Sequence, residues 1–261
     1  MPAYDKSMSY LASDQVCAHR GASGTAPENT LIALEKACGM AVGSIEFDIS
    51  LLGDGNPVIH HDAQFGRTVR GSERLQDLVL GDIAGCDAGA WFGDEFAGQT
   101  IPLLMDVLVL LNRHAKLPIL DVKIHHDEHE AFAKALAETL TMAIGQTDLD
   151  DYLISSFSRP FLESMRSVMP DAPLVLLDEA LPSDWADYSD ALGLQAIHLD
   201  YRQITPDDVR AVRAAGLDCR VYTANDPVVV QPLIAAGLTT VISDFPERFL
   251  APNGSLAVNE V

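Results

Sequence analysis

The sequence predicts an α/β barrel, in which a closed sheet of mainly parallel strands is surrounded by helices. Short apolar runs alternate with helical stretches along most of the chain, which is the pattern of repeated strand–helix units. The length of 261 residues suits one large barrel, and a hydrophobic content of 48% provides for a substantial core. No linker, repeat or low-complexity segment interrupts the pattern, so we expect a single domain over residues 1–261.

Nine short runs have the composition of buried strands, one more than an ideal eight-stranded barrel contains. The second and third runs are joined only by Gly53-Asp54-Gly55-Asn56, which is a hairpin turn and too short for a parallel crossover. One of these two strands should therefore run antiparallel or lie at the barrel edge. The predicted strands are Val16–Ala18, Ser44–Leu52, Pro57–His60, Pro118–Lys123, Tyr152–Ser155, Leu174–Leu177, Ala196–Leu199, Cys219–Thr223 and Thr240–Ile242.

Helices are predicted between the strands. One helix has apolar residues at every fourth position, and a glycine follows where a C-terminal cap belongs. Two later helices each have a proline just inside the start and a glycine just past the end, the usual asymmetry of helix termini. The residues that carry these signals are Phe132, Leu136, Leu140, Ile144 and Gly145 in the first helix, Thr205-Pro206 and Gly216 in the second, and Asp226-Pro227 and Gly237 in the third.

The stretch from Gln64 to Thr100 differs from the rest of the chain. It has no strong hydrophobic period and is rich in glycine and aspartate. We interpret residues 64–100 as an insertion that folds over one face of the barrel.

The net charge of −21 argues against nucleic acid or an anionic membrane surface as a partner. The longest apolar run, Leu103–Leu111, is interrupted by Asp106, and no apolar segment in the first twenty residues resembles a signal peptide, so membrane insertion is not expected. The cysteines form no Cys-x-x-Cys pair, and we expect reduced thiols in a cytoplasmic protein. They are Cys17, Cys38, Cys86 and Cys219. The oligomeric state is left open.

Residues able to carry chemistry gather at the ends of the predicted strands, which in an α/β barrel meet at one rim. Residues two apart on a strand face the same side, so such pairs point together into the barrel mouth. The resulting set offers imidazoles, carboxylates, an arginine and a lysine around one cavity. Its members are His19 and Arg20, Glu46 and Asp48, His60 to Asp62, Asp121 and Lys123, Tyr222, Thr223 and Asn225, and Asp244.

This combination suits phosphodiester cleavage. The reaction builds negative charge on the phosphoryl oxygens, and a divalent cation with an arginine is able to stabilise that charge. Carboxylate oxygens favour a hard cation such as Mg²⁺ or Ca²⁺. Two histidines are able to act as general base and general acid near neutral pH.

At these positions the chain resembles the glycerophosphodiester phosphodiesterase family. The matching motifs follow the family order from about Ala18 to Pro246, nearly the whole chain. One motif such as His-Arg-Gly is a weak signal, but ten in order are a strong one. They are His19-Arg20-Gly21, Pro27-Glu28-Asn29-Thr30, Glu46-Phe47-Asp48, Asp54-Gly55, Val58 to Asp62, Arg67-Thr68, Ile101-Pro102-x-Leu104, Asp121-x-Lys123, Ser155-Ser156-Phe157 and Asp244-Phe245-Pro246.

The resemblance implies a distorted TIM barrel with a small insertion, and metal-dependent hydrolysis of a small-molecule glycerophosphodiester to glycerol 3-phosphate and an alcohol. It implies that His19 is the general base and His61 the general acid. It further implies one divalent cation, Mg²⁺ or Ca²⁺. By the same resemblance Glu46, Asp48 and Asp121 hold the metal, Arg20 and Lys123 contact the phosphate or orient the carboxylates, and Tyr222 lies in the leaving-group pocket.

The sequence departs from the family pattern in two places. The family usually has glutamate where this chain has Asp121, and tryptophan where it has Tyr222. The aspartate side chain is one methylene shorter than that of glutamate. Asp121 would therefore contact the metal either directly or through a water molecule, and both alternatives stay open. The tyrosine changes the shape expected for the leaving-group pocket.

Several residues near these motifs have simpler interpretations. Adjacent residues on a strand face opposite ways, so His60 is expected to pack or face solvent while His61 enters the site. Asn29 and Thr30 are candidates for capping the first helix. His125 and His129, four apart, are a weak candidate for a second metal site. His114 and His198 are interpreted as core or edge residues, and Cys17 as a buried apolar group.

Two rival functions remain beside the main one. The first is a related phosphodiesterase acting on a lysophospholipase D-type or phosphoinositide substrate. The second is a non-catalytic phosphoester-binding barrel. The presence of His19, His61, Glu46 and Asp48 argues against the second, because a binding protein needs no pair of proton-transfer groups.

Overall fold

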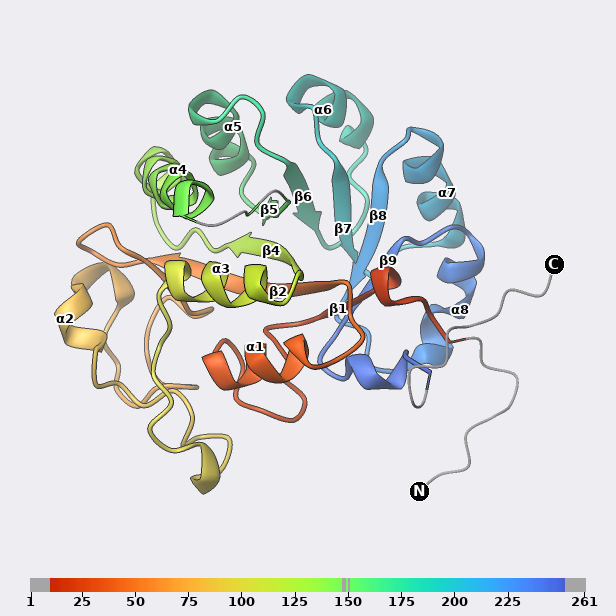
Figure 1. Ribbon diagram of the computed structural model, residues 1–261. Helices are drawn as coiled ribbons and strands as arrows, with labels where there is room; N and C mark the ends of the chain where they lie inside the picture. The colour runs from red at the N-terminus through yellow and green to blue at the C-terminus, as the bar shows by residue number, and fades with distance from the viewer. Residues whose placement is uncertain (1–9, 147–148, 150, 252–261) are drawn as a thin grey trace.

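The computed structural model describes residues 10–146, 149 and 151–251. In this part of the chain nine strands form one sheet that closes into a barrel, with helices around its outside (Figure 1). The strand order is β1-β9-β8-β7-β6-β5-β4-β2-β3, and an additional pairing of β1 with β2 closes the ring. The predicted α/β barrel is thus confirmed. The strands are β1 Val16–Ala18, β2 Ser44–Leu51, β3 Pro57–Ile59, β4 Leu117–Val122, β5 Leu153–Ser156, β6 Leu174–Asp178, β7 Ala196–Asp200, β8 Asp218–Tyr222 and β9 Thr240–Ser243.

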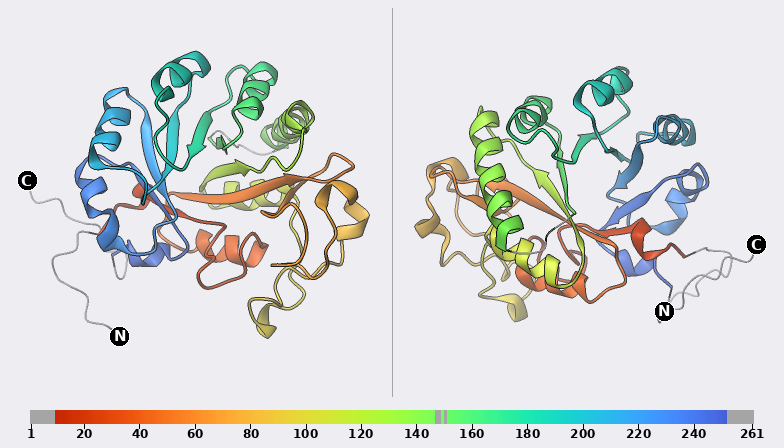
Figure 2. Two further views of the ribbon diagram at one scale, coloured as in Figure 1. Left: turned by 180° about the vertical axis from the view of Figure 1, so that it is seen from behind. Right: turned by 45° about the horizontal axis from the view of Figure 1, so that its top comes forward.

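Helices cover the outer face of the strands, as the further views in Figure 2 show. Among the described residues, no helix combines the length and the apolar character needed to cross a membrane. The α-helices are α1 Leu31–Cys38, α2 Leu80–Ile83, α3 Leu104–Arg113, α4 His129–Gln146, α5 Arg159–Val168, α6 Trp185–Leu192, α7 Pro206–Ala214 and α8 Pro227–Ala235. Short 3-10 helices occur at Ser13–Gln15, Leu75–Asp77, Asp94–Phe96 and Pro246–Arg248.

The extra strand is explained by β2, which uses one edge for two partners. Near its start β2 pairs with β1 in parallel, with Ser44 aligned to Cys17. Near its end it pairs with β3 in antiparallel, with Ile49 aligned to Ile59. Along its other edge β2 pairs with β4 in parallel. The hairpin predicted from the four-residue link is therefore confirmed, and β3 lies outside the parallel ring.

The end of α4 differs from the prediction. Phe132, Leu136 and Leu140 are buried, but Ile144 is 42% exposed and Ala143 takes the buried position instead. A helix turns about 100° per residue, so a spacing of four drifts about 40° at each step and about 120° over three steps. Ile144 has therefore left the buried face. Gly145 is no cap either, because α4 continues to Gln146.

Residues 64–100 carry α2 and two of the 3-10 helices and extend to one side of the barrel, in gold in Figure 1. Together with Leu52, Val58 and Ile101 they form a hydrophobic cluster that is separate from the main core. The hairpin turn joins this segment to the barrel, because the Gly53 N–H donates to the carbonyl of Leu78 at 2.9 Å. The cluster contains Leu52, Val58, Phe65, Val69, Leu75, Leu78, Ile83, Ala88 and Ile101.

Candidate active site

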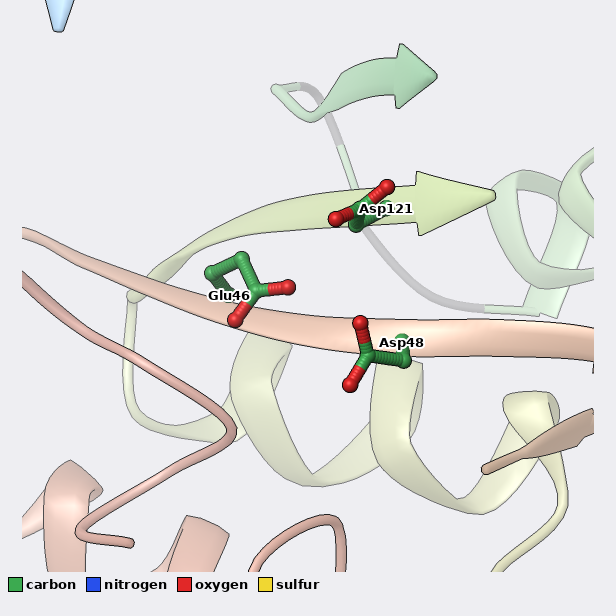
Figure 3. A group of neighbouring side chains, drawn as sticks. All are labelled: Glu46, Asp48 and Asp121. Atoms are coloured by element: carbon green, nitrogen blue, oxygen red, sulfur yellow. The ribbon is translucent and has the colours of Figure 1, made fainter. Parts of the chain in front are cut away.

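Three carboxylates meet at the barrel mouth. Glu46 and Asp48 alternate on β2, so both face inward, and the sheet register places Asp121 of β4 directly beside Asp48. One potential ligand oxygen from each of the three lies within 4.8 Å of the others. Figure 3 shows the three side chains directed toward one another from the two neighbouring strands. All three residues are buried.

The chemistry of this cluster suits a hard divalent cation. Glu46 Oε1 and Asp121 Oδ1 are buried and have no hydrogen-bond partner among the described residues. Burial and the neighbouring Asp48 raise the pKa of Glu46 to about 7. Burial also raises the pKa of Asp121 above its ordinary value. Buried oxygens without partners are costly, and coordination of a cation would satisfy them.

Two cationic side chains hold the carboxylates in place. Lys123 Nζ lies 2.5 Å from Asp121 Oδ2 and 3.1 Å from Asp48 Oδ1. Arg20 Nε lies 2.8 Å from Asp48 Oδ2, and the Arg20 backbone N–H donates to Glu46 Oε2 at 2.9 Å. Although burial opposes it, the charges of Lys123 and Arg20 lower the pKa of Asp48. In this structure both cations are paired with carboxylates of the cluster.

The His19-Arg20-Gly21 motif has a backbone explanation. Arg20 and Gly21 both have positive φ angles, 53° and 80°, so the chain turns sharply after β1. A side chain on Gly21 would meet the backbone of Ala33 in α1 at 2.6 Å. Glycine is therefore required both for the φ angle and for the close approach of α1.

His19 is oriented by a carboxylate from the opposite end of the chain. Its Nδ1 lies 2.6 Å from Asp244 Oδ1, and its Nε2 lies 3.9 Å from Glu46 Oε2. Asn225 donates to Asp244 Oδ2 at 2.8 Å and fixes that carboxylate. Burial lowers the pKa of His19, but the Glu46 charge and the hydrogen bond to Asp244 raise it above its ordinary value overall. The bond to Asp244 leaves Nε2 as the nitrogen that faces Glu46 of the carboxylate cluster.

The two histidines at the end of β3 point in different directions. His61 lines the cavity, and its Nδ1 lies 2.7 Å from Asp62 Oδ1. His60 is buried and packs edge-on against Phe65 with ring centroids 5.7 Å apart. Burial lowers the pKa of His60 to about 4. The structure thus places His61 at the cavity and His60 in the packing.

A cavity of about 420 Å³ joins these groups. On the side formed by β5 and β8, the Tyr222 ring packs edge-on against Phe157, and Lys123 lies over the Phe157 ring at 5.6 Å. The Tyr222 hydroxyl donates to the carbonyl of Asp178 at 2.9 Å, so the ring has a fixed position. The polar lining residues are His19, Arg20, Glu46, His61, Asp121, Lys123, Ser155, His198, Arg202, Tyr222, Thr223, Asn225 and Asp244.

The weaker candidate residues have other roles. Thr30 caps α1 through Ala33, whereas Asn29 does not cap it and instead exchanges two hydrogen bonds with Asp48. His125 precedes α4 and His129 begins it, so the two do not share a helix face. Within the described ranges, no second group of three ligands lies close enough to hold an ion.

His198 and His114, which the sequence grouped together, lie in different environments. His198 is 1% exposed on β7 and is one of the residues that line the cavity. His114 is exposed at the C-terminal end of α3.

The sequence did not assign roles to the residues that orient the histidines. Asp244 and Asn225 orient His19, and Asp62 orients His61. A signal for the two aspartates was present, since both belong to matched motifs. Their pairing is a property of the tertiary structure, because His19 and Asp244 are separated by 225 residues in the sequence.

Comparison with known proteins adds independent evidence. Residues 19–248 match the model of the glycerophosphoryl diester phosphodiesterase family. A glycerophosphodiester phosphodiesterase of Bacillus subtilis (strain 168) is 31% identical over 250 residues, covering 89% of this chain and 84% of the relative. One from Caldanaerobacter subterraneus subsp. tengcongensis is 30% identical over 239 residues, covering 90% and 96%.

A solved structure is also similar over most of the chain. It is an Oleispira antarctica phosphodiesterase in complex with the product sn-glycerol-3-phosphate, with a TM-score of 0.86 and 32% identity over 90% of this chain and 94% of that one. The family and the enzyme class predicted from the motifs are confirmed. On this evidence the chain belongs to the glycerophosphoryl diester phosphodiesterase family.

Proposed function

We propose that this enzyme hydrolyses glycerophosphodiesters to glycerol 3-phosphate and an alcohol. The observation that carries the proposal is the meeting of two carboxylate-bound histidines and a buried carboxylate cluster in one cavity. The family match and the product bound to the Oleispira antarctica phosphodiesterase support the same substrate class.

Glu46, Asp48 and Asp121 are proposed to hold one divalent cation, Mg²⁺ or Ca²⁺. Their oxygens are of the type these ions prefer, and Glu46 Oε1 and Asp121 Oδ1 are among the buried oxygens without a hydrogen bond within the described residues. When bound, the cation would stabilise negative charge on the phosphoryl oxygens.

His19 and His61 are proposed to move the two protons of the reaction. Burial raises the pKa of Asp244, but the hydrogen bond from His19 lowers it overall, so this carboxylate is charged and Nδ1 of His19 carries the proton it donates. Nε2 of neutral His19 is then a base for the nucleophile. His61 Nδ1 is bound to Asp62 in the same way, and in the doubly protonated ring its Nε2–H would be the proton given to the departing alkoxide.

Arg20, Lys123 and Tyr222 are proposed to bind substrate. Both cations line the cavity of a chain whose net charge is −21, and they supply the positive charge that a phosphate needs. Tyr222 and Phe157 form an aromatic wall of the cavity, which suits the alcohol part of the diester.

The proposed partner is therefore a small molecule, with neither nucleic acid nor membrane insertion involved. The four cysteines are free thiols, in agreement with the cytoplasmic location we propose.

The decisive experiment is turnover of glycerophosphocholine, followed by release of glycerol 3-phosphate. Chelator should abolish activity, and Mg²⁺ or Ca²⁺ should restore it. His19→Ala and His61→Ala should each lower turnover ~10²–10⁴-fold, the range for loss of a general acid or base. Lysophosphatidylcholine and a glycerophosphoinositide are measured alongside to test the rival substrates.

His60→Ala is the matched control, because His60 adjoins His61 but packs away from the cavity. Its turnover should change much less than that of His61→Ala. Full activity in metal-free enzyme would refute the proposal that the reaction depends on a divalent cation. Binding of glycerophosphocholine without hydrolysis would instead indicate a non-catalytic phosphoester-binding barrel.

A further inference from the structure

Arg67 lies between two carboxylates just after β3. Its guanidinium donates to Glu28 Oε2 and Oε1 at 2.7 and 2.8 Å. It also donates to Asp62 Oδ2 and Oδ1 at 2.8 and 3.2 Å. The flat fork of an arginine fixes the plane of each carboxylate that it binds through two bonds.

Asp62 and Glu28 each also form a hydrogen bond with a residue of the proposed site. Asp62 Oδ1 lies 2.7 Å from His61 Nδ1. Glu28 Oε1 accepts a hydrogen bond from Arg20 Nη1 at 2.7 Å. Arg67 therefore connects His61, which follows β3, to Arg20 beside the carboxylate cluster.

The position of Arg67 is itself set by its surroundings. The Gly66 N–H donates to the carbonyl of Val69 at 2.8 Å and closes a tight turn around Arg67. Val69 is buried in the hydrophobic cluster that residues 64–100 form with the ends of the neighbouring segments. The Arg67 side chain leaves this anchored turn toward Asp62, whose side chain is 25% exposed. Without Arg67, this partly exposed carboxylate would lose two of its hydrogen bonds and would be able to rotate toward solvent.

The pKa shifts of Asp62 and Glu28 are consistent with their hydrogen bonds to Arg67. Burial raises the pKa of Asp62, but the hydrogen bonds from Arg67 and His61 lower it overall. Burial also opposes the charge of Glu28, and the bonds from Arg67 lower its pKa as well. Asp62 thus remains a charged acceptor for the Nδ1–H of His61.

We propose that Arg67 is a positioning residue for His61 and acts through Asp62. By fixing the Asp62 carboxylate, it aims Nε2 of His61 at the leaving oxygen of the substrate. The proposal rests on the proposed function, in which His61 protonates the departing alkoxide.

The test compares two leaving groups on the same glycerophosphate. Choline leaves as a strongly basic alkoxide and needs a proton, whereas 4-nitrophenol leaves as a stable anion and needs little help. Arg67→Met should lower kcat for glycerophosphocholine ~10-fold or more and change KM little. For the 4-nitrophenyl diester kcat should fall less than ~3-fold, because only general-acid catalysis is impaired.

Arg67→Lys and Arg70→Met complete the experiment. Lysine restores a charge but no fork, so Arg67→Lys should recover part of the lost kcat. Arg70 is exposed in the same segment and forms no ion pair with the described residues, so Arg70→Met should leave both substrates unchanged. Melting curves show whether each variant is folded. If Arg67→Met fails to fold, the same comparison of the two substrates is made with Arg67→Lys.

Two outcomes would overturn the proposal. An equal loss of kcat on both substrates would show that Arg67 acts through Glu28 and Arg20, or on the stability of the protein, and not through His61. An unchanged kcat for glycerophosphocholine would remove any role in positioning. Failure of the wild-type enzyme on both diesters would instead refute the proposed function, so the two failures are distinguishable.

Discussion

Asp121 is shorter than the glutamate expected from the family resemblance, yet its carboxylate joins the same cluster as Glu46 and Asp48. The sheet register explains why. Asp121 is aligned with Asp48, whereas Glu46 lies two residues further back on β2. Glu46, which lies further from Asp121 along the strands, has the longer side chain. At position 121, directly beside Asp48, an aspartate is long enough to join the cluster.

Asp121 should consequently matter for metal affinity. Asp121→Asn removes one negative charge from the cluster and should raise the Mg²⁺ concentration for half-maximal activity ~10-fold or more, whereas Asp121→Glu should be tolerated. Calorimetric titration with Mg²⁺ provides a measure independent of turnover. Asp187→Asn, on the exposed face of α6, is the control. An unchanged Mg²⁺ affinity in Asp121→Asn would exclude this residue from the ligand set.

His198 should make the stability of the protein depend on pH. Burial and the nearby Arg220 charge lower the pKa of His198 well below its ordinary value of 6.5. Below pH 6.5 the unfolded chain binds a proton here that the native state does not, so the free energy of unfolding falls as pH falls. The contribution is about 1.4 kcal/mol per pH unit for one proton.

Urea unfolding between pH 7 and 5 measures this slope. His198→Gln should reduce the slope of the free energy of unfolding against pH by up to about 1.4 kcal/mol per pH unit, the contribution of one proton. This change in slope is expected whatever the substitution does to the stability at pH 7. His114→Gln, at an exposed position, should leave the slope as in the wild type. If both variants retained the wild-type slope, protonation of His198 would not be linked to unfolding.

At the scale of elements, the β2–β3 turn is the point where residues 64–100 meet the barrel. A side chain on Gly53 would lie 2.2 Å from the carbonyl oxygen of Gln76, a backbone atom that is unable to move alone. Gly53→Ala should therefore lower the free energy of unfolding by about 1–3 kcal/mol, the usual cost of overpacking. A Cβ on Gly81 in α2 meets nothing within 4 Å, so Gly81→Ala should be neutral or stabilising in the same urea titration.

The strands were predictable from the sequence to within one residue at each end. Each is a short apolar run between polar turns, and inward and outward positions are both buried in a covered parallel sheet. The end of α4 was predicted wrongly, because spacing by four follows a helix only for two or three turns before the residues drift off its buried face. A glycine in the last turn was then mistaken for a cap.

At the scale of the whole molecule, the sequence located the residues of the candidate site but not their partners. His19, Glu46 and Asp121 were recognisable because strand ends converge at one rim of a barrel. That Asn29 binds Asp48, or that Arg67 reaches Glu28, depends on loops whose paths no local pattern defines. The proposed catalytic and binding roles of these residues remain predictions for the experiments above.

The first and last strands of the barrel, β1 and β9, are neighbours, with Val16 aligned to Val241. The His19–Asp244 pair joins the ends of the same two strands, across 225 residues of sequence. A loop of this length costs entropy to close, and local contacts elsewhere in the chain do not depend on it. During synthesis the early strands are therefore able to pair while His19 still lacks its carboxylate. Catalytic competence is thus tied to folding order, since the proposed base is complete only after the last strand has joined the first.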